Sequence, residues 1–431
     1  MPSSKVFCNV PWYKVMVKNN GHYVNCCLQP NDTTTPTINE ISPIEWHNHD
    51  RMNDLRLRAL GDDPIHECTR CYESEDYSNV SSRIRDNYKS VIFPDEQFEQ
   101  SFNQSPHKFV FDYSLENYGK TIQKPLDYTL SFGNECNLAC KMCFPLYSSK
   151  ISAQYKKWNI NDVNVRENWS ADDSNWNKLI TSLSETKDLI RITIVGGEPM
   201  INKRFDDLLD FLIESKLSNK ISLGFVTNGT TFKLSQIEKL QQIKHLDVEI
   251  SLESILDNNH YIRQGSDTSI ILENILKFKE HLVDNSIISL STAPQLFSVN
   301  TYDLLIRWCL EHNIPIDSHH VSNPEYLVIS LLPDKIKKQF KEKYLLLRKE
   351  LMELQTIKRI SFGSDPTRIV DTLIIEIDKI IGLLDLPLKD RIEKEQQLVE
   401  WATKWDKVYN LDARVIFPEY KEWLEEIGYS V

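Results

Sequence analysis

The stretch LDYTLSFGNECNLACKMCF, residues 126–144, joins a strand-like segment to three closely spaced cysteines. Its first part contains tyrosine, threonine and phenylalanine, side chains that favour an extended strand. Cys136, Cys140 and Cys143 then fall within eight positions. Thiols gathered directly after a strand indicate a metal site or a catalytic site at the end of that strand.

Strand-like and helical stretches alternate from this point across almost 200 residues. Such alternation predicts parallel βα units. Six units favour an α/β fold, a partial (β/α)6 TIM-type barrel, in which functional groups lie at the carboxyl ends of the strands. The expected strands are residues 126–132, 191–197, 221–229, 246–254, 286–294 and 314–322.

The chain on either side of this core differs from it. Residues 1–120 have no clear periodicity but hold five of the nine cysteines. A metal site would help this segment to fold, because it has few residues that could form an apolar core. Helical periodicity prevails at residues 335–354, 368–384 and 391–408. We therefore expect a small cysteine-rich domain over residues 1–120, the barrel core over 121–325 and a helical C-terminal region over 326–431.

Composition restricts the partners and the location of the protein. With a formal charge of −12 and a pI of about 5.5, the chain is not expected to bind nucleic acid or anionic membranes nonspecifically. It has no uninterrupted apolar run of about 18 residues, so no membrane span is expected. Its first residues, MPSSKVFCNVPW, lack the apolar core of a signal peptide. We expect a cytoplasmic protein, whose reduced cysteines serve as metal ligands or catalytic groups.

Two kinds of metal site fit the three cysteines after the first strand. A structural zinc ion takes four ligands, and no fourth cysteine follows closely. A cubane 4Fe–4S cluster has four irons, each of which wants a ligand, so three cysteines leave one iron open to a substrate. Spacing alone leaves both possibilities.

A second motif, IVGGEPM at residues 194–200, ends the second expected strand. Glycine is scarce in this chain, at 12 of 431 residues, so a Gly-Gly pair at a strand end is informative. Gly196 and Gly197 would let a ligand approach the backbone, and the Glu198 carboxylate could accept a hydrogen bond from a ligand ammonium. A plain strand-to-helix turn, with Glu198 as an acid in the first helical turn, explains the same residues.

Together the two motifs resemble those of the radical S-adenosylmethionine (radical SAM) enzymes, which carry CxxxCxxC after the first barrel strand and GGEP after the second. Cys136, Cys140 and Cys143 match the first motif, and residues 196–199 match the second. The resemblance covers about residues 126–320. It implies that the cysteines hold a 4Fe–4S cluster whose open iron binds S-adenosylmethionine. Reductive cleavage of that cofactor yields methionine and a 5′-deoxyadenosyl radical, which takes a hydrogen atom from the substrate.

The resemblance also implies roles for single residues around the cofactor. Glu198 would accept a hydrogen bond from the methionine ammonium. Met142 stands where the family often has an aromatic residue against the adenine, and a thioether can make an apolar contact there. Ser251 and Glu253, at the end of the fourth strand, are candidates for a contact with the ribose. Arg263 is a candidate for a contact with cofactor or substrate, and an ordinary surface position is the alternative.

The N-terminal cysteines resemble the ligands of an auxiliary cluster. Cys8, Gly21 and Cys26 follow the spacing C-x12-G-x4-C, which resembles the opening of the SPASM module or of its shorter form, twitch. With the CxxC of Cys68 and Cys71, four cysteines would hold a second 4Fe–4S cluster. A four-cysteine zinc site is the alternative. In characterised relatives this module usually follows the barrel, whereas here it precedes it.

The resemblance implies a radical SAM enzyme that modifies a peptide or protein, because family members with auxiliary clusters often do so. It also implies a reductant such as flavodoxin or ferredoxin. A small metabolite or a nucleotide is the alternative substrate, and a non-catalytic iron–sulfur or zinc-binding scaffold is the alternative function. The sequence does not single out a catalytic residue.

Overall fold

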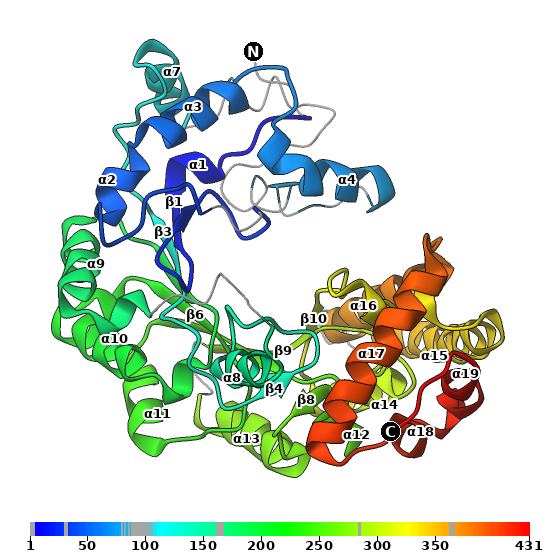
Figure 1. Cartoon of the computed structure of the whole chain (residues 1–431). Helices are drawn as coiled ribbons and strands as arrows, with labels where there is room; N and C mark the ends of the chain where they lie inside the picture. The colour runs from blue at the N-terminus through cyan, green and yellow to red at the C-terminus, as the bar shows by residue number, and fades with distance from the viewer. Residues whose placement is uncertain are drawn as a thin grey trace.

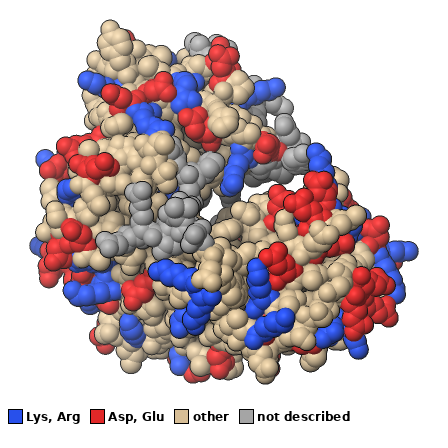
Figure 2. Space-filling model, viewed as in Figure 1, with Lys and Arg blue, Asp and Glu red and all other residues tan. Residues whose placement is uncertain are grey.

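The computed structural model consists of one large open sheet with helices around it (Figure 1). The N-terminal elements, blue in Figure 1, lie above the barrel, and the C-terminal helices, orange and red, lie to its right. The space-filling view shows the molecule hollowed between these two parts (Figure 2). The described residues are 5–29, 33–78, 81, 83, 84, 87, 103, 107–160, 168–282, 286–361 and 367–431.

Eight strands form the main sheet, in the spatial order β10–β9–β7–β6–β5–β3–β1–β2. Neighbouring strands run parallel except at the edge, where β2 runs antiparallel to β1. Within the described residues the end strands β10 and β2 do not pair with each other, so the barrel is open. A second sheet pairs β4 with β8 in antiparallel fashion. The strand bounds are β1 (Lys14–Val17), β2 (Tyr23–Val24), β3 (Asp127–Leu130), β4 (Ala139–Cys140), β5 (Arg191–Ile194), β6 (Ser222–Thr227), β7 (His245–Ser251), β8 (Arg263–Gln264), β9 (Ser286–Thr292) and β10 (Ile316–Ser318).

The six predicted strands are present as β3, β5, β6, β7, β9 and β10, which confirms a mixed α/β fold with a mostly parallel sheet. The predicted number of barrel strands needs one correction, because β1 adds a further parallel strand from the N-terminal residues. It pairs with β3, with Lys14 opposite Asp127 and Val17 opposite Leu130. This strand has only four residues and depends on a partner far away in the sequence, so local periodicity did not indicate it. The boundary near residue 120 stays a prediction.

Successive residues of the central strands alternate between two environments. In β7 the side chains of Leu246 and Ile250 are buried in the apolar core, whereas Asp247 and Glu249 are half-buried on the opposite face. Arg191 of β5 reaches across that face to Asp247, with an N–O distance of 2.9 Å. The inner face of the open barrel therefore carries charged side chains, whereas a closed barrel is filled by apolar ones.

The helices around the barrel begin at polar caps. Asp172 accepts hydrogen bonds from the backbone N–H groups of Ser174 and Asn175 at the start of α9, and Asp267 caps α13 in the same way. Such caps satisfy N–H groups that have no partner within the helix. The bounds are α8 (Ser149–Lys157), α9 (Asp173–Glu185), α10 (Lys203–Glu214), α11 (Leu234–Leu240), α12 (Asn258–Ile262), α13 (Thr268–His281) and α14 (Tyr302–His312), with short 3-10 helices η3 (Trp169–Ala171), η4 (Pro199–Ile201), η5 (Leu217–Asn219), η6 (Glu325–Leu327) and η7 (Ile329–Leu331).

Short helices surround β1 and β2 in the N-terminal part. The buried Arg56 ties them together, because its guanidinium donates to the carbonyl oxygens of Pro11 and Gly119 at 2.9 and 3.1 Å. The bounds are α1 (Val10–Tyr13), α2 (Pro43–His47), α3 (Asp50–Ala59), η1 (His66–Cys68), α4 (Thr69–Ser78) and α7 (Lys108–Glu116).

The C-terminal residues form helices that pack on the barrel. α15 and α16 lie against each other, and α17 crosses in front of them toward α12 and β8 (Figure 1). Among the described residues, no helix is both long and apolar enough to cross a membrane. The separate status of this region stays a prediction. The bounds are α15 (Asp334–Ser361), α16 (Thr367–Asp385), α17 (Arg391–Tyr409), α18 (Ala413–Ile416), η8 (Pro418–Tyr420) and α19 (Lys421–Glu426).

Candidate cofactor site

The three clustered cysteines lie on the loop that leaves β3 at the carboxyl edge of the sheet. Cys140 belongs to β4 and pairs with Arg263 of β8. The Cys143 N–H donates to the Cys140 carbonyl at 3.0 Å, which closes a tight turn. Cys140 is buried, and Cys136 and Cys143 are half-buried. Backbone pairing therefore fixes the loop.

The thiols of this loop lie close enough to affect one another's ionisation. The pKa of Cys140 is raised to about 12, mainly by burial and also by the Cys136 thiol. Burial raises the pKa of Cys143 as well, and both other thiols add to the rise. Ligation requires thiolates, and a bound metal centre supplies the positive charge that buried thiolates lack. The three thiols therefore lie within electrostatic range of one another, and their joint ligation of a metal centre stays a prediction.

Hydrogen-bond donors face the same thiols. The Arg263 guanidinium donates to Cys140 Sγ at 3.5 Å, and the Leu138 N–H donates to Cys136 Sγ at 3.5 Å. The Asn228 amide lies 4.0 Å from Cys136 Sγ. Donors of this kind stabilise sulfur ligands and tune the centre that they hold. Three thiols with a guanidinium and amide donors form a donor set that fits an iron–sulfur cluster.

Arg263 is held in place by a buried carboxylate. Its Nη2 donates to Glu253 Oε1 at 2.7 Å, and its Nε donates to Glu253 Oε2. The Glu253 side chain is 0% exposed and also accepts from the Ala293 N–H at 3.1 Å. Arg263 is thus not an ordinary surface residue. The ribose contact of Glu253 stays a prediction, as does that of Ser251, which is buried at the end of β7.

The Gly-Gly turn docks onto the cysteine loop. The Glu198 N–H donates to the Glu135 carbonyl at 2.7 Å. Gly196 and Gly197 have φ values of 78° and 62°, in the left-handed region that favours glycine. A Cβ on Gly197 would lie 2.7 Å from the Glu135 carbonyl oxygen. The close approach of the two loops therefore requires glycine even before a ligand is considered.

The Glu198 carboxylate is buried and joins the ends of two strands. Its Oε1 accepts from the Met200 N–H at 3.0 Å and from Thr227 Oγ1 at 2.7 Å. Its Oε2 accepts from the Asn228 N–H at 2.6 Å. Burial raises the pKa of this carboxyl group. One acceptor position of Oε2 remains after these bonds, and a contact with a ligand ammonium stays a prediction.

Asn19 is a site residue that the sequence analysis missed. It follows β1 and is buried, and its Nδ2 donates to the carbonyl oxygens of Gly133 and Leu146 at 2.9 and 2.8 Å. These carbonyls lie at the two ends of the cysteine loop, so one amide holds both. A Cβ on Gly196 would lie 2.6 Å from Asn19 Oδ1, which gives a second reason for that glycine. Only the pairing of β1 with β3 could have revealed this contact.

Lys141 connects the cysteine loop to the C-terminal helices. This buried side chain, between Cys140 and Met142, forms an ion pair with Asp406 of α17 at 3.5 Å. Its ammonium also lies 3.8 Å from the centroid of the Tyr261 ring. The Met142 side chain is half-buried against the main core, and its adenine contact stays a prediction.

Three of the four N-terminal cysteines predicted as ligands lie close together. The pKa of Cys26 is raised to about 12, mainly by burial and also by Cys68. The pKa of Cys68 is raised to about 11, again mainly by burial, and Cys71 adds to the rise. Cys27 is exposed, whereas Cys26 is half-buried. The two adjacent thiols thus have different surroundings.

Cys8 lies in the same region as Cys71. Arg83 donates from its side chain to the Phe7 carbonyl at 2.8 Å and from its backbone N–H to the Cys71 thiol. Arg83 therefore contacts both Cys71 and Phe7, the residue directly before Cys8. In the part of the chain described, no three His, Cys, Asp or Glu side chains are arranged to hold one metal ion.

One family model matches the central part of the chain. Residues 130–293 match the family model described as "Radical SAM superfamily". The sporulation killing factor maturation protein SkfB of Bacillus subtilis (strain 168) is 22% identical over 197 residues, which are 46% of this chain and 41% of SkfB. The chain thus matches less than half of the length of that relative.

Two solved structures are similar to this chain over larger shares. Streptococcus suis SuiB bound to S-adenosylmethionine is 19% identical, with a TM-score of 0.37, and the match covers 64% of this chain and 56% of SuiB. Native anSMEcpe with bound AdoMet is 19% identical, with a TM-score of 0.40, and the match covers 55% of this chain and 62% of anSMEcpe.

Proposed function

We propose, from the premise that residues 130–293 form a radical SAM superfamily domain, that the chain cleaves S-adenosylmethionine reductively and modifies a peptide or protein. The superfamily match supports the prediction of an enzyme. One observation carries the proposed chemistry: three mutually close thiols lie on the loop to which the Glu198 N–H donates. Cys136, Cys140 and Cys143 would hold a 4Fe–4S cluster, which, with S-adenosylmethionine bound, supplies a 5′-deoxyadenosyl radical.

The residues around these thiols have defined tasks in this proposal. Arg263 and Asn228 donate hydrogen bonds to the sulfur ligands, and Glu253 keeps Arg263 oriented. Glu198 fixes the turn that faces the cysteine loop and offers its remaining acceptor position to a ligand ammonium. The Asn19 amide holds the two ends of the loop. None of these groups has to move a proton for the cleavage, so their contribution is positioning and electrostatics.

A peptide or protein substrate is proposed on two grounds. The chain is similar to SkfB, whose name describes it as a maturation protein of a killing factor. The spacing of the N-terminal cysteines also resembles that of an auxiliary cluster, which in related enzymes often accompanies peptide substrates. A reductant such as flavodoxin or ferredoxin and a cytoplasmic location complete the proposal.

Anaerobic reconstitution with iron and sulfide tests this function. We expect a brown protein that forms 5′-deoxyadenosine from S-adenosylmethionine when dithionite is added, because the proposed chemistry needs only an electron and the cofactor. Iron, sulfide and zinc are quantified in the same samples. A colourless zinc protein that leaves S-adenosylmethionine intact would contradict the proposal and favour the scaffold.

The same proposal assigns a second 4Fe–4S cluster to Cys8, Cys26, Cys68 and Cys71. Its support is the proximity of the last three thiols and the place of Cys8 beside the segment that contacts Cys71. All three thiols have a raised pKa, so the apoprotein holds them protonated at neutral pH. Cluster insertion there is expected to release protons.

Single replacements of Cys26 and Cys27 distinguish a ligand from its neighbour. Cys26→Ala is expected to lower the iron content from about eight to about four per chain, because one ligand of the second cluster is lost. Cys27→Ala is the matched control, since this adjacent thiol is exposed, and it should retain nearly all of the iron. Iron and sulfide per chain are measured, with Mössbauer spectra to separate the clusters. The reverse pattern would exchange the two residues' roles.

A further inference from the structure

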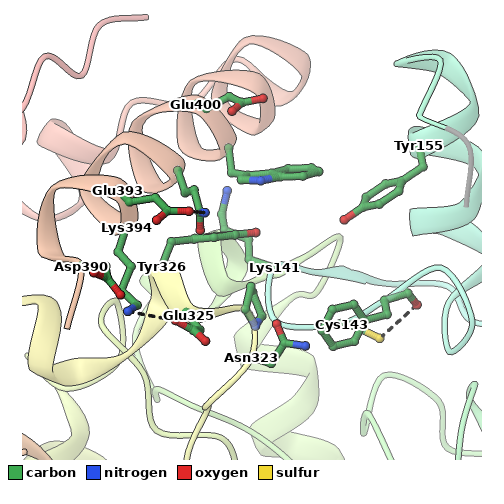
Figure 3. A pocket seen from close by; sticks show the side chains of 14 residues that line it. Lys141, Cys143, Tyr155, Asn323, Glu325, Tyr326, Asp390, Glu393, Lys394 and Glu400 are labelled. Atoms are coloured by element: carbon green, nitrogen blue, oxygen red, sulfur yellow. Dashed lines mark hydrogen bonds and ion pairs between the residues drawn. The ribbon is translucent and has the colours of Figure 1, made fainter. Parts of the chain in front are cut away.

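A cavity of about 610 Å³ opens between the cysteine loop and α17 (Figure 3). Cys143 and Tyr155 lie on one side of it, and Asp390, Glu393 and Glu400 lie on the other. Its volume is in the range of ligand pockets. We propose that this cavity binds a cationic side chain, lysine or arginine, of the peptide substrate. The inference rests on the proposed function and names the substrate class that the site selects.

The position of the cavity favours substrate binding. Cys143, one of the three thiols predicted to ligate iron, is part of its wall. A side chain bound there would lie beside Cys143, one of the residues that would hold the proposed metal centre. The other wall is α17, which is anchored to the same loop through Lys141 and Asp406. The cavity thus adjoins the cysteine loop, which contributes Lys141 and Cys143 to its wall.

Aromatic rings line the cavity and favour a cation. Trp401 lies between two tyrosines, with ring centroids 5.4 Å from Tyr155 and 6.1 Å from Tyr326. The Lys404 ammonium lies 5.1 Å from the Trp401 centroid, so the protein already places one cation against this stack. The negative faces of such rings attract ammonium and guanidinium groups.

Two charged groups in the cavity wall neutralise each other in an ion pair. Lys394 forms an ion pair with Glu325 at 2.9 Å, as the dashed line in Figure 3 shows. Two other lining groups have partners that do not line the cavity, because Lys141 pairs with Asp406 at 3.5 Å and Glu400 pairs with Lys404 at 2.6 Å.

Asp390 and Glu393 remain without a cation. Neither forms an ion pair with any residue that the structure describes, and Glu393 Oε1 accepts only from the Gln397 amide, at 3.3 Å. The space-filling view shows acidic side chains gathered over the upper part of α17, beside the hollow of the molecule (Figure 2). Two exposed carboxylates that lack an ion-pair partner among the described residues, beside aromatic rings, are features that recognise a cationic side chain.

A selection with random peptides tests the inference without knowledge of the natural substrate. Synthetic random decapeptides are incubated anaerobically with the reconstituted, S-adenosylmethionine-loaded full chain, and the bound peptides are identified by mass spectrometry. We expect lysine and arginine to be enriched over the input. The double variant Asp390→Asn, Glu393→Gln should lose most of that enrichment, and a selected lysine peptide should bind about tenfold more weakly to it. Asn tolerates the left-handed backbone of Asp390, so the variant keeps its fold.

The matched control removes two acidic groups elsewhere on the C-terminal region. Glu419→Gln, Glu426→Gln alters two exposed carboxylates that do not line the cavity, and the same change in net charge should leave the enrichment intact. The variant Glu393→Lys should instead enrich aspartate and glutamate. No enrichment with the unaltered chain, or equal loss in both double variants, would overturn the inference. Formation of 5′-deoxyadenosine by the unaltered chain is measured separately, so failure of the cofactor chemistry is distinguishable from failure of the cavity.

Discussion

Replacing Cys136, Cys140 and Cys143 together by Ala is expected to abolish formation of 5′-deoxyadenosine from S-adenosylmethionine. The three thiols lie within electrostatic range of one another on one loop, and each is proposed to ligate one iron, so without them no cluster can deliver the electron. The measurement is 5′-deoxyadenosine and methionine after incubation with dithionite, together with iron per chain. Product should fall to the level of a reaction without protein, and iron should fall by about four per chain.

Cys309→Ala is the control for this triple replacement. Cys309 is fully buried in the apolar packing of α14, away from any predicted ligand group, so its loss should leave product formation unchanged. If the triple variant still cleaves S-adenosylmethionine, the three cysteines are not the ligands of the catalytic cluster. If the Cys309 variant is equally inactive, loss of product reflects loss of the fold instead.

Asp406→Ala is expected to destabilise the protein by about 3–5 kcal/mol, the usual cost of breaking a buried ion pair. The Asp406 carboxylate is 0% exposed and pairs with Lys141, whose side chain is 3% exposed. It also accepts from the hydroxyl groups of Tyr261 and Tyr429 and from the Ala413 N–H. Removal leaves a buried ammonium and several donors without their partner. The free energy of unfolding is measured by urea denaturation.

The consequence for function is that α17 should loosen from the cysteine loop. We expect Asp406→Ala to retain less iron after reconstitution, because Lys141 stands between the proposed ligands Cys140 and Cys143. Asp385→Ala is the control: its ion pair with Lys341 is exposed, and its loss should change the free energy of unfolding by no more than about 1 kcal/mol. Equal changes in the free energy of unfolding for the two replacements would show that the buried ion pair stabilises the protein no more than the exposed one.

The sequence was most informative where local pattern carries the signal. The barrel strands from β3 to β10 were predicted from alternation and strand propensity, which depend on near neighbours. The positions of the cysteines and of the Gly-Gly turn at the ends of β3 and β5 followed from the same reading. The role of the glycines was predicted only in part, because their contact with the Glu135 carbonyl became visible only in the structure.

Long-range contacts account for what could not be predicted. The pairing of β1 with β3 joins residues far apart in the sequence, and the strand is too short for its own pattern to reveal it. Asn19 enters the site only through that pairing. The ion-pair partners of Arg263 and Lys141 come from other elements. The sequence around a charged residue does not indicate whether an oppositely charged partner will be buried beside it.

The sequence by itself determined the six barrel strands β3, β5, β6, β7, β9 and β10, the place of the three thiols after the first of them and the match to the radical SAM motifs, because spacing and periodicity are local properties. Only the tertiary structure decided that N-terminal residues extend the sheet, that the buried Glu253 and Asp406 pair with the two cations beside the cysteines, and that α17 and Cys143 line one cavity. These features arise from burial, which brings charges and thiols from distant elements together at a cost that only their mutual contacts offset.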